Sequence, residues 1–135
     1  MNLIKIGEEG TEMIDFQNGV FKLKKTNENS VAKDISPLFI EGEQLIGCYK
    51  GVRDYVVFTN KRVIAVNVQG VTGKKKDFTS LPYAKVQAFS VETAGHLDLD
   101  SELDLWFSGL GMVRFEFTGG SDIVQIGKLI GMYIL

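Results

Sequence analysis

The sequence contains very few of the residues that build catalytic or metal sites. It has one histidine, His96, and one cysteine, Cys48. A single cysteine excludes an internal disulfide and is compatible with a reducing compartment. We find no glycine-rich phosphate loop, no His-Glu-x-x-His pair and no Ser/His/Asp arrangement for nucleophilic catalysis. The sequence therefore predicts a protein that is not an enzyme and that uses no metal and no cofactor.

Long hydrophobic runs and a large net charge are missing as well. No window approaches the roughly 20 apolar residues that a transmembrane helix needs, and the N-terminal apolar stretch is too short for a signal peptide. The net charge of −2 provides no global field that would attract nucleic acid or an anionic membrane. The 135 residues, 44% of them hydrophobic, suffice for one core. We expect one cytoplasmic domain that does not bind nucleic acid.

The sequence does contain many short segments with the period of two that is typical of β-strands. Tyr55–Thr59 and Arg62–Val68 are rich in β-branched and aromatic residues, and Asn60 and Lys61 separate them. A turn at Gly70–Gly73 follows, flanked by glycine on both sides. Further strands are predicted at residues 45–50, 78–80, 86–91, 97–107 and 112–117.

The period changes near the C-terminus. Ser121 is a good N-cap, and Asp122 is favourable near the positive end of a helix. Isoleucines then follow at the helical spacing of 123, 126, 130 and 134. About seven strands followed by one helix predict a mainly β fold, in which the C-terminal α-helix closes one end of a bent pair of sheets.

Residues 1–33 are predicted to form an N-terminal extension that precedes a domain at 34–135. Met13–Phe16 and Val20–Leu23 flank an Asn18-Gly19 pair, which suits a type I′ turn, so we expect a hairpin here.

The following segment is polar and has no periodicity, so Lys24–Ser30 is predicted to be a loop. Asp34–Ile40 is predicted to form a short helical turn, because Pro37 lies near its start, where proline is tolerated.

Several motifs in the second part of the chain carry a family resemblance. They are Val52-Arg53-Asp54, Phe58–Arg62, Gln69–Lys75, Leu81-Pro82-Tyr83, Phe89–Gly95 and Asp98–Leu103. In order and spacing they resemble the bacterial pleckstrin-homology-like (PH-like) family over residues 40–135. The resemblance implies two nearly orthogonal antiparallel sheets, a C-terminal helix capping one open corner, and homo-oligomeric rings, with pentamers as the expected form. Residues 1–33 depart from the short helix that the family has before its first strand.

Basic residues gather around two of the predicted turns. Lys50 and Arg53 flank the first turn, while Lys74, Lys75 and Lys76 follow the turn at Gly70–Gly73. The resemblance implies that both turns lie at the open end where eukaryotic relatives bind phosphoinositide headgroups, and such cations would suit phosphate. The sequence lacks the lysine followed by Arg-x-Arg that marks those binders. Two interpretations stay open: a patch for an anionic ligand or membrane lipid, and ordinary solubilising lysines.

Acidic and apolar residues alternate before residue 108. Leucines 97, 99, 103 and 105 and Phe107 are predicted to face the core, and Asp98, Asp100, Glu102 and Asp104 the solvent. Clustered carboxylates can bind calcium, but an extended strand holds alternate side chains about 6.6 Å apart rather than curled around an ion. A solvated strand face is therefore expected.

Apolar surface in an unexpected place gives the strongest functional signal. Trp106 falls on the acidic, solvent-facing side of its strand, and tryptophan is enriched at interfaces. The helix carries Leu129, Met132 and Tyr133 beyond its isoleucine face. Its glycines, Gly127 and Gly131, each cost about 1 kcal/mol of helix propensity, which suggests close approach to another backbone. We expect self-association; the alternatives are a helix buried within one subunit and an adaptor that binds another protein through a strand edge. The sequence itself names no biological role.

Overall fold

The computed structural model describes residues 3–6, 11–14, 22–95, 97, 99–119 and 123–135. Eight of its strands form one continuous sheet in the order β7-β6-β5-β4-β3-β10-β9-β8. Their bounds are β3 Lys22–Lys25, β4 Leu45–Lys50, β5 Tyr55–Thr59, β6 Arg62–Gln69, β7 Lys75–Pro82, β8 Val86–Glu92, β9 Ser101–Phe107 and β10 Gly111–Phe117.

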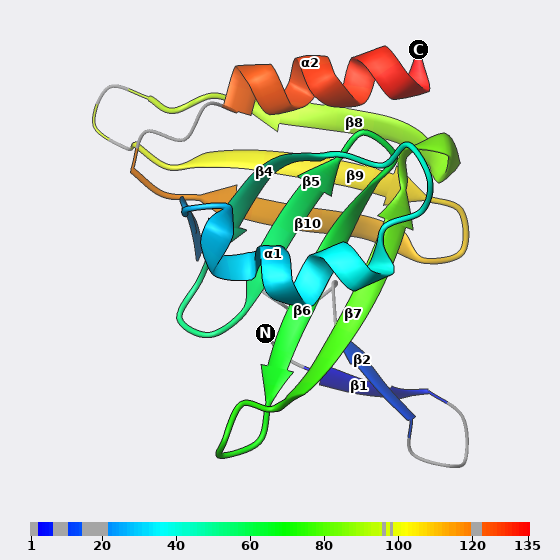
Figure 1. Ribbon diagram of the computed structural model, residues 1–135. Coiled ribbons are helices and arrows are strands. Elements are labelled where there is room, and N and C mark those ends of the chain that lie inside the picture. The colour runs from blue at the N-terminus through cyan, green and yellow to red at the C-terminus, as the bar shows by residue number, and fades with distance from the viewer. Residues whose placement is uncertain (1–2, 7–10, 15–21, 96, 98, 120–122) are drawn as a thin grey trace.

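The sheet folds over into two layers. The antiparallel meander β4–β7 crosses the antiparallel meander β8–β10 steeply in Figure 1. The short strand β3 joins them, because it pairs antiparallel with β4 at Lys24↔Lys50 and parallel with β10 at Lys22↔Glu116. With the C-terminal helix α2 (Ile123–Ile134) over one end of the layers, this arrangement confirms the predicted mainly β, PH-like fold.

The main core lies between the layers and beneath α2. Ile123, Ile126 and Ile130 of the helix pack into it, while Ile134 is only partly buried. The predicted cap residues Ser121 and Asp122 lie outside the described residues. A Cβ added to Gly127 would lie 2.8 Å from Val91 Cγ2 of β8. The close approach expected of this glycine is therefore to a side chain of the same chain, and not to another backbone.

A second, smaller core lies on the outer face of β4–β6. The helix α1 (Asn29–Ile35) crosses this face in Figure 1 and buries Val31 and Ile35 against Tyr55, Val57 and Ile64. The predicted loop over residues 24–30 is therefore wrong at both ends, since β3 reaches Lys25 and α1 begins at Asn29.

Two local hydrogen bonds start this helix within the polar run. The Asn29 amide donates to Asn27 Oδ1 at 2.9 Å, and Ser30 Oγ donates to the Asn27 carbonyl at 2.6 Å. A 3₁₀ turn, η1 (Ser36–Leu38), follows with Pro37 near its start, within the span predicted to be a helical turn.

The N-terminal hairpin prediction is wrong in its strand partners. β2 (Thr11–Ile14) pairs with β1 (Leu3–Ile6), whereas Leu23 of β3 pairs with Phe117. The predicted Asn18-Gly19 turn lies outside the described residues. Leu23 is almost fully buried in the main core, and this long-range burial places β3 beside β10.

Two strand bounds also differ from the prediction. β7 begins at Lys75, so Lys75 and Lys76 belong to a strand. β9 begins only at Ser101, because its ladders with β8 and β10 start at residues 101–102. Leu97 and Leu99 precede these ladders and are 95% and 62% exposed, so their predicted burial is wrong.

A buried carboxylate fixes the segment before β4. Glu43 accepts hydrogen bonds from Arg62 Nε at 2.9 Å and Nη2 at 2.8 Å, and from Thr59 Oγ1 at 2.7 Å. Burial alone would raise the pKa of Glu43, but the hydrogen bonds from Arg62, Thr59 and the Ile40 amide outweigh it and lower the pKa. The ionised carboxylate therefore ties this segment to β5 and β6.

Candidate functional site

Three of the five predicted basic residues line one pocket at the β4–β5 turn. Lys50, Arg53 and Lys76 surround a cavity of about 310 Å³, which we call the basic pocket. Arg53 Nη2 donates to the Gly70 carbonyl at 2.5 Å and so holds the β4–β5 turn against the β6–β7 turn. The remaining lining residues are Ser30, Val31, Asp34, Val52, Tyr55 and Val68.

One acidic side chain neutralises part of the basic pocket. Lys76 Nζ lies 3.4 Å from Asp34 Oδ2, and the Tyr55 hydroxyl donates to the same oxygen at 3.1 Å. Burial raises the pKa of Tyr55, and Asp34 raises it further, so the phenol stays protonated. Lys74 and Lys75 do not line the pocket. Ser30 and Asp34 come from α1, and the position of this helix beside the turns was not predicted.

A second surface is the outer face of β8–β10, which we call the Trp106 face. In register, it carries the cross-strand rows Ala88–Trp106–Met112, Ser90–Asp104–Arg114 and Glu92–Glu102–Glu116. Trp106 is 37% exposed and stands beside the small Ala88. The face is apolar at one end and acidic at the other.

The middle row of this face corrects the expected solvated strand. Asp104 is 9% exposed and accepts from Arg114 Nε at 2.8 Å and Nη2 at 3.0 Å. Burial raises the pKa of Glu102, and Arg114 opposes this rise, while Glu92 adds to it.

Asp98 lies outside the described residues. Among the residues that are described, no group of His, Cys, Asp or Glu could hold a metal ion.

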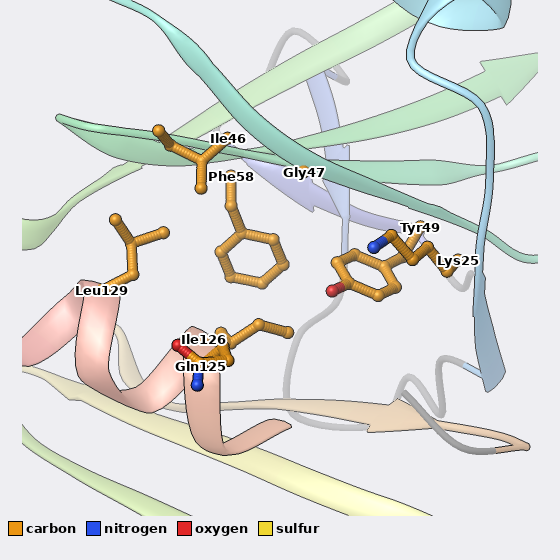
Figure 2. Close-up of a pocket in the computed structure, with 8 residues that line it drawn as sticks. All are labelled: Lys25, Ile46, Gly47, Tyr49, Phe58, Gln125, Ile126 and Leu129. Carbon is orange, nitrogen blue, oxygen red and sulfur yellow. The ribbon is translucent and has the colours of Figure 1, made fainter. Parts of the chain in front are cut away.

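The third surface includes a pocket between α2 and β4. This helix pocket has a volume of about 250 Å³. Figure 2 shows the ring of Phe58 at its centre, Ile46 and Leu129 on one side, Tyr49 on the other, and the Lys25 ammonium beside Tyr49. The pocket is lined by Lys25, Ile46, Gly47, Tyr49, Phe58, Gln125, Ile126 and Leu129.

The predicted interface residues fall on two separate surfaces. Leu129 lines the helix pocket, Met132 is 75% exposed, and Tyr133 stacks on Tyr83 with ring centroids 6.1 Å apart while remaining 45% exposed. Trp106 lies on the opposite side of β9 from Leu105, which packs in the core beneath α2. The sequence did not reveal Ile46 and Phe58 as pocket residues, because long-range packing brings them to the helix.

Other reactive groups have structural surroundings. Cys48 is buried, its Sγ donates to the Thr26 carbonyl at 3.3 Å, and burial raises the pKa of the thiol. His96 lies outside the described residues. Within the described part of the chain, no helix is long and apolar enough to cross a membrane.

Comparison with known proteins yields a consistent set of relatives. The family model for the bacterial PH domain matches residues 15–134. The chain is 46% identical over 103 residues to the uncharacterized protein YjqA of Bacillus subtilis, covering 75% of this chain and 82% of that protein.

Two solved structures are similar in both sequence and fold. One is a DUF1696 family protein with a pleckstrin-homology domain from Shewanella loihica, with 41% identity, a TM-score of 0.73, and coverage of 85% of this chain and 99% of that chain. The other is a pleckstrin homology domain from Shewanella amazonensis, with 42% identity, a TM-score of 0.62, and coverage of 87% and 93% respectively.

Proposed function

The chain belongs to the bacterial PH domain family, and on this basis we propose that it is a non-catalytic, cytoplasmic interaction module that assembles with copies of itself into a homo-oligomeric ring. A pentamer is the expected form. The observation that carries the proposal is the presence of two exposed apolar surfaces in the described part of the chain, one on the Trp106 face and one on α2.

The two surfaces have the properties of interface anchors. Trp106 and Met112 lie together on one side of the sheet, and Met132 and Tyr133 lie on the helix at the other side. Tryptophan, tyrosine and methionine are enriched at protein interfaces, and energetic anchors are commonly large aromatic residues. The fold therefore offers a subunit two different contact patches.

The position of the patches favours a ring over a two-fold dimer. A two-fold contact uses the same patch on both subunits, whereas a head-to-tail contact uses two different patches. Repeated head-to-tail contacts close into a ring when the rotation between subunits allows it. A closed ring of head-to-tail contacts covers both the Trp106 face and the helix surface in every subunit, whereas a single two-fold contact covers only one of them.

The mass in solution tests the ring directly. A pentamer of the 15.0 kDa chain has a mass of about 75 kDa, which light scattering on a gel-filtration peak resolves from a monomer or dimer. A monomer at micromolar concentration would refute the proposal.

A mixing experiment separates head-to-tail from two-fold contacts. Trp106→Arg removes one patch and Met132→Glu removes the other, so each variant alone is expected to be monomeric. Mixed together, they retain one intact patch each and are expected to form a heterodimer of about 30 kDa.

The control for this experiment is Val71→Glu, an equally drastic change at a fully exposed residue of the β6–β7 turn. This variant should assemble like the wild type. Failure of the mixture to form a heterodimer would rule out the head-to-tail arrangement, even if the wild type forms an oligomer.

One observation favours a second candidate function, the binding of an anionic ligand. The basic pocket brings Lys50, Arg53 and Lys76 around one cavity, with the Ser30 residue of α1 beside them. Such convergent cations suit a phosphate group. Sedimentation with vesicles that contain an anionic phospholipid is the assay, since polybasic surfaces are attracted to such membranes.

The basic pocket makes a specific prediction in this assay. Lys50→Glu should abolish sedimentation, while Lys85→Glu, a charge reversal at an exposed residue that directly precedes β8 and does not line the basic pocket, should leave it unchanged. Equal sedimentation of both variants and the wild type would exclude the basic pocket as a membrane site, and binding of inorganic phosphate without vesicles would identify a small anion as the ligand.

A further inference from the structure

We propose that the indole of Trp106 inserts into the helix pocket of the neighbouring subunit. This inference rests on the proposed self-assembly and specifies its central contact. The occupant of the helix pocket is thus a second copy of the chain, and each subunit both supplies an anchor and receives one.

The volume and lining of the helix pocket suit an indole. An apolar cavity of about 150 Å³ holds a benzene molecule, so scaling from six ring atoms to the nine of indole gives about 225 Å³. The helix pocket has a volume of about 250 Å³. Its walls include the aromatic rings of Phe58 and Tyr49 and the aliphatic side chains of Ile46 and Leu129 (Figure 2). Aromatic rings favour edge-to-face or offset contacts with one another, so the rings of the pocket suit an entering indole.

The charges around anchor and pocket are complementary. The Trp106 face carries four carboxylates, Glu92, Glu102, Asp104 and Glu116, against the single guanidinium of Arg114. At the rim of the helix pocket lies the exposed Lys25, which has no ion pair among the residues that the structure describes. Docking of this acidic face beside Lys25 would favour one orientation and speed association more than it would raise the affinity.

A subunit cannot fill its own helix pocket with its own tryptophan. Trp106 points away from the core side of β9, while Ile126 of the pocket belongs to the core on the opposite side of that strand. Among the described residues, β3 pairs in register with Tyr49 and Lys50 of β4, and the Thr26 amide extends this contact to the Cys48 carbonyl, so no described strand pairs with Ile46 and Gly47 on this edge. The pocket is therefore accessible to a neighbour along Ile46 and Gly47.

Trp106 is the only tryptophan of the chain, so its fluorescence reports on this contact alone. In the oligomer, the emission should be blue-shifted and poorly quenched by acrylamide. After dilution to the monomer, the emission should shift to the red, and quenching should increase several-fold.

The variant that tests the pocket is Gly47→Val. A Cβ on Gly47 would lie 3.7 Å from Tyr49 Cε2, an ordinary contact, and valine suits a strand, so the subunit should fold. The added side chain occupies the mouth of the pocket and should raise the dissociation constant of the contact at least tenfold. Leu129→Gln, which replaces an apolar wall by a polar one of similar length, provides a second variant with the same expected direction.

The control variant is Leu99→Gln, which makes the same substitution as Leu129→Gln at an exposed leucine outside both surfaces. It should leave assembly and quenching unchanged. Circular dichroism of each variant checks that the subunit is folded.

The possible results separate this inference from the proposed function. If the protein assembles while acrylamide still quenches Trp106 strongly, or if neither pocket variant affects assembly, the inference is wrong but the proposed ring still stands. A wild-type monomer would overturn both. Protection of Trp106 in the wild type that both pocket variants abolish, and that Leu99→Gln preserves, supports the inference.

Discussion

The two glycines of α2 offer a test in which local packing decides whether an added methyl group stabilises or destabilises the fold. In a helix interior, Gly→Ala stabilises by about 1 kcal/mol through backbone entropy and solvation. At Gly131 the new Cβ would lie 3.7 Å from Leu135 Cδ1 and 3.8 Å from Phe89 Cζ, which are ordinary van der Waals distances. Gly131→Ala should therefore stabilise the fold by up to about 1 kcal/mol.

At Gly127 the same methyl group meets an obstacle. Its Cβ would lie 2.8 Å from Val91 Cγ2, and a β-branched side chain has few alternative rotamers. Overpacking of this kind costs about 1–3 kcal/mol, so it outweighs the gain in helix propensity. We expect Gly127→Ala to destabilise the fold by about 1 kcal/mol, which leaves the two variants about 2 kcal/mol apart.

Urea unfolding followed by circular dichroism measures this difference. One kcal/mol corresponds to about 4 °C in Tm for a domain of this size, so a thermal scan should order the variants in the same way. Both must be compared at a fixed protein concentration, because self-association makes Tm depend on concentration. If Gly127→Ala proves as stable as Gly131→Ala, the helix does not press on Val91 and the packing of α2 on β8 is looser than described.

Three further predictions concern the interior. Glu43→Gln should lower the free energy of unfolding at pH 7 by about 2 kcal/mol, because it leaves the Arg62 guanidinium without its carboxylate. Since the folded state lowers the pKa of Glu43, the stabilisation is present above the unfolded-state pKa and is lost as the pH falls through the folded-state pKa. The gap between wild type and Glu43→Gln in urea unfolding should thus narrow in acid; a gap that is constant with pH would contradict this assignment. Tyr83→Phe should cost about 1–2 kcal/mol, because the buried hydroxyl donates to the Thr59 carbonyl at 2.7 Å; no loss in a urea titration would show that water replaces the bond. Ile35→Ala should lower the free energy of unfolding by about 3 kcal/mol, because it leaves a cavity in the small core under α1. Relative to the wild type, amide exchange should become faster in α1 more than in β9; an equal increase in both elements would contradict a local effect.

Local periodicity sufficed to predict the strands and helices in which apolar residues alternate or recur at helical spacing over several residues. Leu103, Leu105 and Phe107 alternate inward, and Ile123, Ile126 and Ile130 recur at helical spacing, so β9 and α2 were predictable from the sequence. Burial alternates along a strand only while the strand is paired. Leu97 and Leu99 precede the paired part of β9, so their alternation wrongly predicted that they are buried.

The remaining elements depend on partners far away in the sequence. The polar segment before Val31 gave no helical period, although two side-chain hydrogen bonds around Asn27 start α1. The neighbours of the basic turns and the walls of the helix pocket come from segments that lie up to about 100 residues apart, as Lys25 and Leu129 do, and no local pattern reveals this. Residue types with interface character, Trp106 above all, were visible in the sequence, but the side of the sheet on which each lies required the fold.

The strand β3 has a consequence for how the protein is made. Its pairing with β10 joins Lys22 to Glu116, and this contact closes a loop of more than 90 residues. A ribosome adds about 5–20 residues per second, so the N-terminal part of the chain emerges many seconds before the strand with which it pairs. During this time Leu23 has no partner at Phe117, and β3 cannot yet pair β4 with β10 in one sheet. The sheet is thus completed last at its centre, where β3 can pair only after β10 has been synthesised. A nascent chain that stalls before β10 leaves this edge of β3 unpaired and exposed to other nascent chains on the same polysome.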